Sequence, residues 1–500
     1  MRITHESLIL PGSHPIGANP LPALRDQRAH LDVRSNGTLL EGEAEGLGQN
    51  TGRRVLPYAV QDRYGRADGP VELQTAVLDN GLLRAVFLTG LGGRLYSLTD
   101  LASGRELLYV NPVLQPANLA IRDAWFSGGV EWNLGQYGHA ASTCDPVFAG
   151  VVRDRATGTP EAFRIWEYER QRGLFWQIDF RLPPGRALLE AHVRIANPRP
   201  HPASLYWWTN AAVPQTRTTR VFSSTSQVIY QDAPAREAWA RENGLPGDSA
   251  GLARAPVFFG HAQLPEFEEE GRAVDATYPS RLRRSFEYFF QVPASEPSPW
   301  EACLHADGTG YFERSTQPLR FRKMFCWGNH AGGRWWQEFL SRPGGTPYLE
   351  LQAGLAPTQL HGATLGAGEE LEFTQVFGGL TLPPGAGDGD WAAASGRVAD
   401  GIVRVAAPAD LKEADAVARR RSRVPVAEAD VAARGSGWGA LEEARSGQAP
   451  PEGFYYPPDS LGREQAPWLQ LVRGEDPDWT APGAGAFVVD PAWRPLMEAA

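Results

Sequence analysis

The sequence is poor in lysine and has no long apolar run. Only Lys323 and Lys412 are lysines, so the cationic side chains are almost all arginine. The net charge of −10 and the lack of a basic stripe argue against a nucleic acid partner, because binding to phosphates requires clustered cations. No run of about 18 apolar residues is present, so we expect no membrane partner. Neutral ligands fit this composition better.

Cysteine and metal-binding motifs are also scarce. Cys144, Cys303 and Cys326 are far apart in the sequence and form no Cys-x-x-Cys pair, so neither a zinc knuckle nor a disulfide framework is expected. There is no His-x-His pair, no His-x-x-x-His pair and no Gly-x-x-x-x-Gly-Lys phosphate loop. The first residues lack the apolar core of a signal peptide. We therefore expect a cytoplasmic protein with no metal and no cofactor.

Glycine and proline, in contrast, are abundant, with 54 Gly and 41 Pro. They separate short strand-like segments, as in the hairpin pattern of residues 71–78 and 82–88 around Asp79-Asn80-Gly81. Similar segments continue to about residue 382 without amphipathic helices between them. Such a pattern predicts a mostly β fold, an antiparallel sandwich.

Three regions follow from this pattern. Residues 1–70 are expected to form N-terminal strands or an arm, residues 71–385 the sandwich, and residues 386–500 a C-terminal extension. Within the sandwich, residues 237–280 are expected to be long loops or an insertion at one edge. The extension is expected to contain two short helices, at residues 391–403 and 408–421. A tail follows that is expected to pack back on the sandwich or on a partner through its tryptophans, namely Trp438, Trp468, Trp479 and Trp493.

The segment of residues 125–139 has the strongest chemical character in the chain. It combines Glu131, Asn133 and His139 with four aromatic rings and four glycines, and it shows no helical or strand periodicity. Glycines allow the backbone to approach a ligand, and chemically mixed loops often carry sites. We therefore expect a turn-rich ligand site here, although each single residue could equally be structural.

A second set of candidates lies on two later strands. Side chains two residues apart point to the same face of a strand, so Tyr348, Glu350 and Gln352 share a face that does not point into the core. The same rule groups Tyr206, Trp208 and Asn210. Aromatic rings beside amide and carboxyl groups suit a sugar, whose C–H face is apolar and whose rim is hydroxyl.

Several motifs together resemble an uncharacterised bacterial family with a galactose-mutarotase-like domain, often found ahead of tetratricopeptide repeats. The motifs occur in order between about residues 71 and 382: Leu-Gly-Gly-Arg-Leu (91–95), Gly-Arg-Glu-Leu-Leu-Tyr (104–109), Asn-Pro-Val (111–113), Ala-Trp-Phe-Ser-Gly-Gly-Val-Glu-Trp-Asn (124–133), Arg-Ile-Trp-Glu-Tyr (164–168) and Trp-Gln-Ile-Asp-Phe (176–180). The repeats themselves are not recognisable in the sequence. The resemblance implies an antiparallel β-supersandwich.

The chain is also distantly similar to aldose epimerases, which bind sugar on the concave face of a supersandwich. The segment from Gly128 to Tyr137-Gly138-His139 resembles their glycine-containing loop, and Glu350 resembles their catalytic glutamate. Asn210 stands about where their acid histidine is expected. Because asparagine cannot donate a proton at neutral pH, this difference argues against simple mutarotase chemistry.

The first hypothesis is therefore a glycoside hydrolase in which Glu131 and Glu350 form a carboxylate pair, one as the acid and the other as the nucleophile or base. The alternatives are an aldose 1-epimerase that uses His139 with Glu350, and a carbohydrate-binding module without catalysis. The expected partner is a small saccharide or glycoside, and a homo-oligomer could form through the C-terminal tail. The residues expected to bind substrate are Arg94, Trp132, Asn133, His139, Tyr206, Trp208, Asn210, Trp327, Tyr348 and Gln352.

Overall fold

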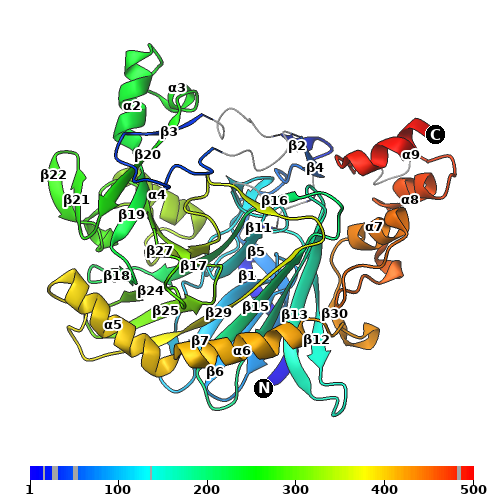
Figure 1. Cartoon of the computed structure of the whole chain (residues 1–500), viewed down its shortest axis with the longest axis horizontal. Coiled ribbons are helices and arrows are strands. Elements are labelled where there is room, and N and C mark those ends of the chain that lie inside the picture. Colours follow the sequence, from blue (N-terminus) through cyan, green and yellow to red (C-terminus); the bar gives the residue numbers. More distant parts are fainter. Residues whose placement is uncertain are drawn as a thin grey trace.

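Two large β-sheets face each other in the computed structural model, which describes residues 1–14, 17, 19–24, 32–48, 55–135, 138–480 and 486–499 (Figure 1). The first sheet has 13 strands. Its order is β1 (Arg2–Gly12), β5 (Gly69–Asp79), β6 (Leu83–Leu88), β7 (Arg94–Asp100), β11 (Val130–Leu134), β17 (Trp207–Pro214), β27 (Tyr348–Gly354), β26 (Phe321–Cys326), β23 (Phe286–Phe290), β19 (Gln227–Gln231), β20 (Val257–Gln263) and β3 (Val33–Ser35), with β8 (Arg105–Glu106) beside β7.

The second sheet has nine strands. Its order is β18 (Arg220–Ser223), β24 (Trp300–Leu304), β25 (Thr309–Ser315), β29 (Glu370–Thr381), β15 (Leu188–Ala196), β14 (Leu174–Arg181), β13 (Pro160–Glu169), β12 (Phe148–Arg153) and β30 (Val431–Ala433). Its neighbouring strands are antiparallel, as are those of the first sheet apart from the β20–β3 pair. The expected fold class, a mostly β antiparallel supersandwich, is confirmed.

Small sheets and helices surround the two large sheets. The two-stranded sheets are β9 (Ala117–Ala120) with β10 (Asp123–Trp125), β16 (Ala203–Leu205) with β28 (Ala363–Leu365), β2 (Pro22–Leu24) with β4 (Val55–Ala59), and β21 (Glu266–Glu269) with β22 (Arg272–Asp275). The short 3-10 helices are η1 (Pro279–Arg281), η2 (Glu428–Asp430), η3 (Pro458–Ser460) and η4 (Pro491–Trp493). No helix in the described part of the chain is long and apolar enough to span a membrane.

The core lies between the two large sheets and follows strand alternation. On β27, Leu349 and Leu351 are fully buried in this core, whereas Glu350 projects from the opposite face. In the second sheet, Ile178 and Phe180 of β14 line the same core. Each buried apolar side chain of this size contributes about 1.5–3 kcal/mol. The core therefore fixes the register that places polar side chains on the other face of the first sheet.

The C-terminal extension packs against the outer face of the second sheet. α5 (Trp391–Val405) and α6 (Pro408–Arg421) cross this face, and α7 (Trp438–Ser446), α8 (Ala466–Val472) and α9 (Arg494–Ala499) gather at one edge (Figure 1). The two predicted helices are confirmed as α5 and α6. Three of the four tail tryptophans are buried in one cluster with Phe148 and Trp166, namely Trp438, Trp468 and Trp493, so packing on the sandwich is confirmed for these three. Trp479 is 49% exposed.

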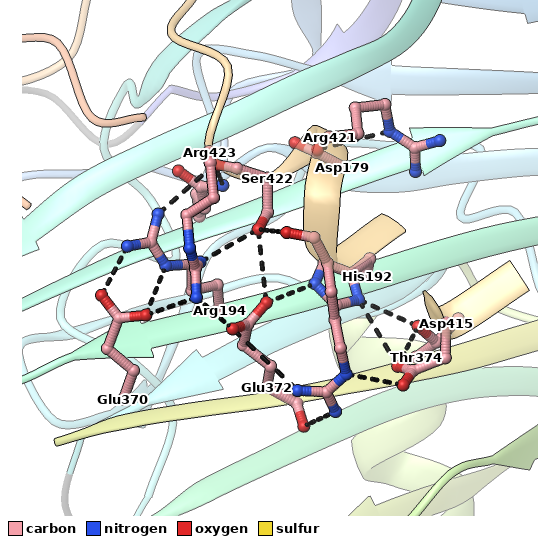
Figure 2. Close-up of polar contacts among 12 residues, drawn as sticks. Asp179, His192, Arg194, Glu370, Glu372, Thr374, Asp415, Arg421, Ser422 and Arg423 are labelled. Carbon is pink, nitrogen blue, oxygen red and sulfur yellow. Dashed lines mark hydrogen bonds and ion pairs between the residues drawn. The ribbon is translucent and has the colours of Figure 1, made fainter. Parts of the chain in front are cut away.

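Ion pairs attach α6 and the residues after it to the second sheet (Figure 2). His192 Nδ1 of β15 lies 3.7 Å from Asp415 Oδ1 of α6, and Arg423 Nη2 lies 2.6 Å from Glu372 Oε1 of β29. Asp415 of α6 accepts a 2.7 Å hydrogen bond from Thr374 Oγ1. The extension is thus bound by charge as well as by apolar contact.

Several local expectations were wrong. The segment of residues 125–139 is not only turns, because β11 is a fully buried central strand of the first sheet. Gly129 explains how a glycine-rich segment enters a strand: its φ is +70°, and a Cβ there would lie 2.2 Å from the Leu95 oxygen. Tyr137 lies outside the described residues.

Residues 237–280 are more regular than expected. The region contains most of α2 (Ala233–Glu242), α3 (Ser249–Leu252), and strands β20, β21 and β22. No helix was predicted between β26 and β27, where the structure has α4 (Ala331–Leu340).

Candidate active site

A row of polar side chains crosses the first sheet on the face opposite the core. Glu131 of β11 is paired with Asn210 of β17, Asn210 with Gln352 of β27, and Gln352 with Lys323 of β26. Directly paired residues of neighbouring strands point to the same face, so the four side chains lie side by side. Four strands from distant parts of the sequence therefore contribute to one polar surface.

Glu350 lies on the same face, two residues before Gln352. Its carboxylate oxygen Oε2 accepts a 3.0 Å hydrogen bond from Gln352 Nε2, and only 5% of Glu350 is exposed. Burial raises the pKa of Glu350, and this effect exceeds the opposing influence of His139, Lys323 and the Asn210 hydrogen bond. A carboxyl group with a raised pKa is suited to exchanging protons near neutral pH.

Glu131 has a different environment although it is equally buried. Trp125 Nε1 donates to its Oε2 over 3.1 Å, Thr143 Oγ1 donates to its Oε1, and Arg94 Nη2 lies 3.4 Å from Oε1. Burial alone would raise its pKa, but the charges of His139 and Arg94 and these hydrogen bonds hold the pKa of Glu131 well below its usual range. Glu131 is therefore a fixed carboxylate.

His139 interacts with both glutamates, by a hydrogen bond with Glu131 and by charge with Glu350. Its Nδ1 is 2.7 Å from Glu131 Oε2, and because a carboxylate can only accept, Nδ1 is the donor. The imidazole also packs against Trp125 and Trp208, with ring centroids 4.8 and 5.1 Å away. This arrangement leaves Nε2 as the nitrogen that can exchange a proton with a ligand.

The backbone beside His139 is held to the same two strands. Trp208 Nε1 donates to the Gly138 oxygen over 3.2 Å, and Asn133 Oδ1 accepts from Ala140 N over 2.7 Å. The segment that carries His139 is therefore positioned by β11 and β17, not only by its own turns. About 16% of the His139 side chain is exposed, more than of Glu131.

Glu131 and Glu350 are on strands that flank β17, with a two-residue offset along the strands. With about 4.8 Å between strands and ~3.3 Å per residue, their Cα atoms are roughly 12 Å apart. The charge of Glu131 also raises the pKa of Glu350, which places the two carboxyl groups within electrostatic range. The two predicted carboxylates, Glu131 and Glu350, thus lie on the same face of the first sheet.

The other predicted substrate-binding residues divide into two groups. Tyr206 packs against Trp208, and Tyr348 stacks on Tyr109 at 4.4 Å within an aromatic cluster that includes Trp327, so these rings lie on the site face. Two residues do not fit the prediction, Arg94 and Trp132.

Trp132 points into the core between the sheets and donates Nε1 to the Gly93 oxygen over 3.1 Å. Arg94 is buried and committed to the protein, since Nη1 donates to the Gly128 oxygen over 2.8 Å and Nη2 faces Glu131. Arg94 Nε has no hydrogen-bond partner among the described residues, but it is buried, and the other polar atoms of the two side chains contact the protein. Their expected role in substrate binding is not supported by these contacts.

Lys323 and Thr143 also belong to the site, although neither was among the predicted site residues, whereas Trp125 begins the predicted segment of residues 125–139. Lys323 Nζ lies 2.7 Å from Glu287 Oε2 and 4.9 Å from the Phe289 ring centre. A lysine in a chain with almost none, at an alternating position of a strand, was the available signal. Thr143 had no signal in the sequence, because its contact with Glu131 depends on a chain segment that folds back.

Among the described residues there is no group of three or more His, Cys, Asp or Glu side chains that could hold a metal ion. The site chemistry available in this part of the chain consists of carboxyl, imidazole, amide and ammonium groups. They can exchange protons and form hydrogen bonds with hydroxyl groups.

Comparisons with known proteins agree with the family resemblance seen in the sequence. Residues 51–253 match a domain of unknown function, DUF5107. The structure of a TPR-domain containing protein from Parabacteroides distasonis has 18% sequence identity and a TM-score of 0.56, and the alignment covers 76% of this chain and 56% of that one. The chain thus spans little more than half of that protein, and the similarity shows a shared fold.

Two further structures are galactose mutarotase-like proteins. The one from Clostridium acetobutylicum has 9% identity and a TM-score of 0.41, covering 62% of this chain and 96% of that one. The one from Lactobacillus casei has 11% identity and a TM-score of 0.38, covering 61% and 99%. The match of residues 51–253 to a domain of unknown function agrees with the resemblance that the motifs indicated, and the similarity to the Parabacteroides distasonis structure shows a shared fold.

Proposed function

We propose that the protein is a carbohydrate-active enzyme that opens and closes an aldose ring at its anomeric centre, with Glu350 and His139 as the acid–base pair. The observation that supports this most is the hydrogen bond of 2.7 Å from His139 Nδ1 to Glu131, which leaves Nε2 for a ligand beside a buried Glu350. Opening a ring requires an acid and a base that act on two different oxygens.

In the proposed reaction the Glu350 carboxylate removes the proton of the anomeric hydroxyl. His139, as imidazolium, gives its Nε2 proton to the ring oxygen, the bond between C1 and that oxygen breaks, and an open-chain aldehyde forms. Rotation about C1–C2 and the reverse proton transfers close the ring with the other anomeric configuration. Glu131 remains ionised throughout and stabilises the imidazolium.

The side chains around this pair suit a neutral sugar. Asn210 and Gln352 offer amide groups to hydroxyls, and the indole of Trp208 offers a flat surface to the C–H face of a pyranose. Asn210 occupies the place where an acid histidine was expected from the resemblance. In the present proposal His139 supplies the acid from the neighbouring segment instead.

A glycosidase that uses Glu131 and Glu350, our first hypothesis from the sequence, fits this geometry less well. The acid of such an enzyme must hold a proton, and Glu131 is ionised through contacts with Arg94, Thr143 and His139. A nucleophile must reach the anomeric carbon, and both oxygens of Glu131 are engaged. We therefore favour the isomerase.

The test is a set of NMR time courses with the purified protein. Freshly dissolved single anomers of several aldoses report ring opening, and aryl glycosides of the same sugars report hydrolysis. The proposal predicts faster equilibration of at least one aldose and intact glycosides. Hydrolysis without faster equilibration would support the glycosidase, and binding without either reaction would support a carbohydrate-binding module.

A further inference from the structure

The polar row of the candidate active site continues across the first sheet as apolar side chains. Lys323 is paired with Phe289 of β23, and Phe289 with Ile229 of β19. Ile229 is in turn paired with His261 of β20. Because directly paired residues point to the same face, Phe289 and Ile229 lie on the site face and separate Lys323 from His261.

A segment near the N-terminus covers these two apolar side chains. Phe289 and Ile229 are buried in one apolar cluster, and Leu39 and Leu47 pack against this cluster. We call the segment of residues 36–48, which follows β3, the strap. None of the strap residues is itself buried, so the strap is a surface layer on the site face. It lies where a ligand extending past this end of the polar row would lie.

Polar contacts hold the strap in this position. His261 Nδ1 donates to Glu43 Oε1 over 2.9 Å, and His361 Nε2 donates to the Glu43 carbonyl oxygen over 2.9 Å. Thr38 Oγ1 accepts from the backbone N–H of His261 over 2.8 Å. The strap is therefore fixed both to β20 and to the segment after β27, and Glu43 contacts both.

The opposite end of the polar row is covered as well. The ring centre of Phe126 lies 4.0 Å from the guanidinium carbon of Arg94, next to Glu131, and Phe126 is buried in a cluster with Leu114 and Cys144. The polar row between the two covered ends spans the four neighbouring strands β11, β17, β27 and β26. At about 4.8 Å between strands, this span is roughly 14 Å between the outer backbones. A ligand that lies along the row is limited to this span.

We propose that the strap is a specificity-determining segment that restricts the site to ligands of one sugar unit. The inference rests on the proposed function, which places the anomeric centre between Glu350 and His139. A second sugar ring that continued along the row would take the place of Leu39 and Leu47. It could bind only if both leucines left the apolar cluster and Glu43 left its two histidines.

The test compares ligands that differ by one sugar ring. NMR titration of the full chain measures the affinities for methyl glucoside and methyl galactoside and for the methyl glycosides of maltose and 4-galactobiose. These rings cannot open, so the measurement reports binding without reaction. The wild type is expected to bind at least one single-ring ligand about tenfold more tightly than its two-ring counterpart.

Two variants loosen the strap by different contacts. The double change Leu39→Ala with Leu47→Ala removes its apolar attachment, and Glu43→Ala removes its carboxylate from His261. Each is expected to reduce the difference between the two ligands to less than about threefold. Leu40→Ala is the matched control, since Leu40 is 53% exposed and outside the apolar cluster, and it should keep the wild-type difference.

The inference is overturned if no methyl glycoside binds, if the wild type binds both ligand lengths equally well, or if both strap variants keep the wild-type difference. Anomer interconversion, measured on the same proteins, keeps the two proposals apart. Interconversion without discrimination of length refutes the role of the strap alone. Discrimination that depends on the strap, without any interconversion, refutes the isomerase and leaves the role of the strap in place. Thermal unfolding of each variant shows whether it has folded.

Discussion

Glu131 Oε2 lies 2.7 Å from His139 Nδ1, so a carboxylate on a central strand fixes an imidazole on the segment that follows it. The other oxygen of Glu131 faces Arg94 at 3.4 Å and accepts from Thr143. Glu131 thus contacts both the buried Arg94 and the imidazole of His139. In the function that we propose, its role is to orient and stabilise His139, and Glu350 and His139 exchange the protons.

The buried pair of Glu131 and Arg94 makes a first prediction. Glu131→Gln leaves Arg94 charged without its carboxylate, and Arg94→Met leaves Glu131 charged without its arginine, with His139 as the remaining cationic partner. Each single change is expected to lower the free energy of unfolding by about 3–5 kcal/mol, because the remaining charge is buried without its partner. Urea denaturation measures the loss.

The double variant supplies the control for this pair. It removes both charges, so its loss of stability is expected to be clearly smaller than the sum of the two single losses. Additive losses would show that the two residues act independently and would contradict the ion pair. Glu413→Gln, an exposed change on α6, should alter the free energy of unfolding by less than about 0.5 kcal/mol.

The second prediction concerns the pH dependence of turnover. Glu350 acts as a base only when ionised, so kcat/KM falls as the pH drops through its pKa. Burial raises the pKa of Glu350, and the charge of Lys323 lowers it. Removing this charge in Lys323→Met should raise the pKa further and move the acidic limb of the profile to higher pH.

The only other lysine provides a matched control. Lys412 is exposed on α6, so Lys412→Met should leave the acidic limb where it is in the wild type. The pH profiles of kcat/KM for both variants decide the point. An acidic limb that stays in place or moves to lower pH in Lys323→Met would mean that Glu350 is not the group whose ionisation is seen.

The attachment of α6 to the second sheet gives a third prediction. Glu372 is partly desolvated, but hydrogen bonding and charge from His192 and the charge of Arg423 outweigh burial and lower the pKa of Glu372 from 4.5 to about 2 (Figure 2). A group with a depressed pKa contributes stability above its ordinary pKa, and this contribution is lost as the pH falls toward about 2. Acid should therefore weaken this attachment.

This loss is measured by the melting temperature between about pH 6 and about pH 2.5, because the Glu372 carboxylate begins to lose its stabilising effect within this range. Wild-type stability should fall more steeply with acid than that of Glu372→Gln, which has already lost the ionisable group. Glu413→Gln should follow the wild type. Parallel curves for the wild type and Glu372→Gln would show that other carboxylates cause the acid sensitivity.

Much of the fold could be predicted from the sequence because strand alternation is a local property. The polar trio of β27 and its neighbours Leu349 and Leu351 were assigned to opposite faces correctly, since side chains of a strand alternate whatever surrounds it. The two helices of the extension followed from local patterns as well. Which strands are neighbours in a sheet depends on residues far apart in the sequence, so local patterns could not predict it.

The segment of residues 125–139 shows this limit. Its glycines are typical of turns, but Gly129 is needed for the close approach of the Leu95 oxygen where β11 enters the sheet. The charge state of Glu131 could not be predicted from the sequence either. It depends on Arg94 of β7 and on Thr143, which approach Glu131 only in the folded chain. The sequence identified the glutamate but could not show that it is already paired.

The most direct measurement of the central claim is the rate of anomer interconversion for the aldose on which the wild type is active, in Glu350→Gln and His139→Gln. We expect the rate of each variant to be lower than the wild-type rate by about 10²- to 10⁴-fold, the usual contribution of a general acid or base. His330→Gln, at an exposed histidine, should retain the wild-type rate. Wild-type rates in both site variants would contradict the assignment of Glu350 and His139 as the acid–base pair.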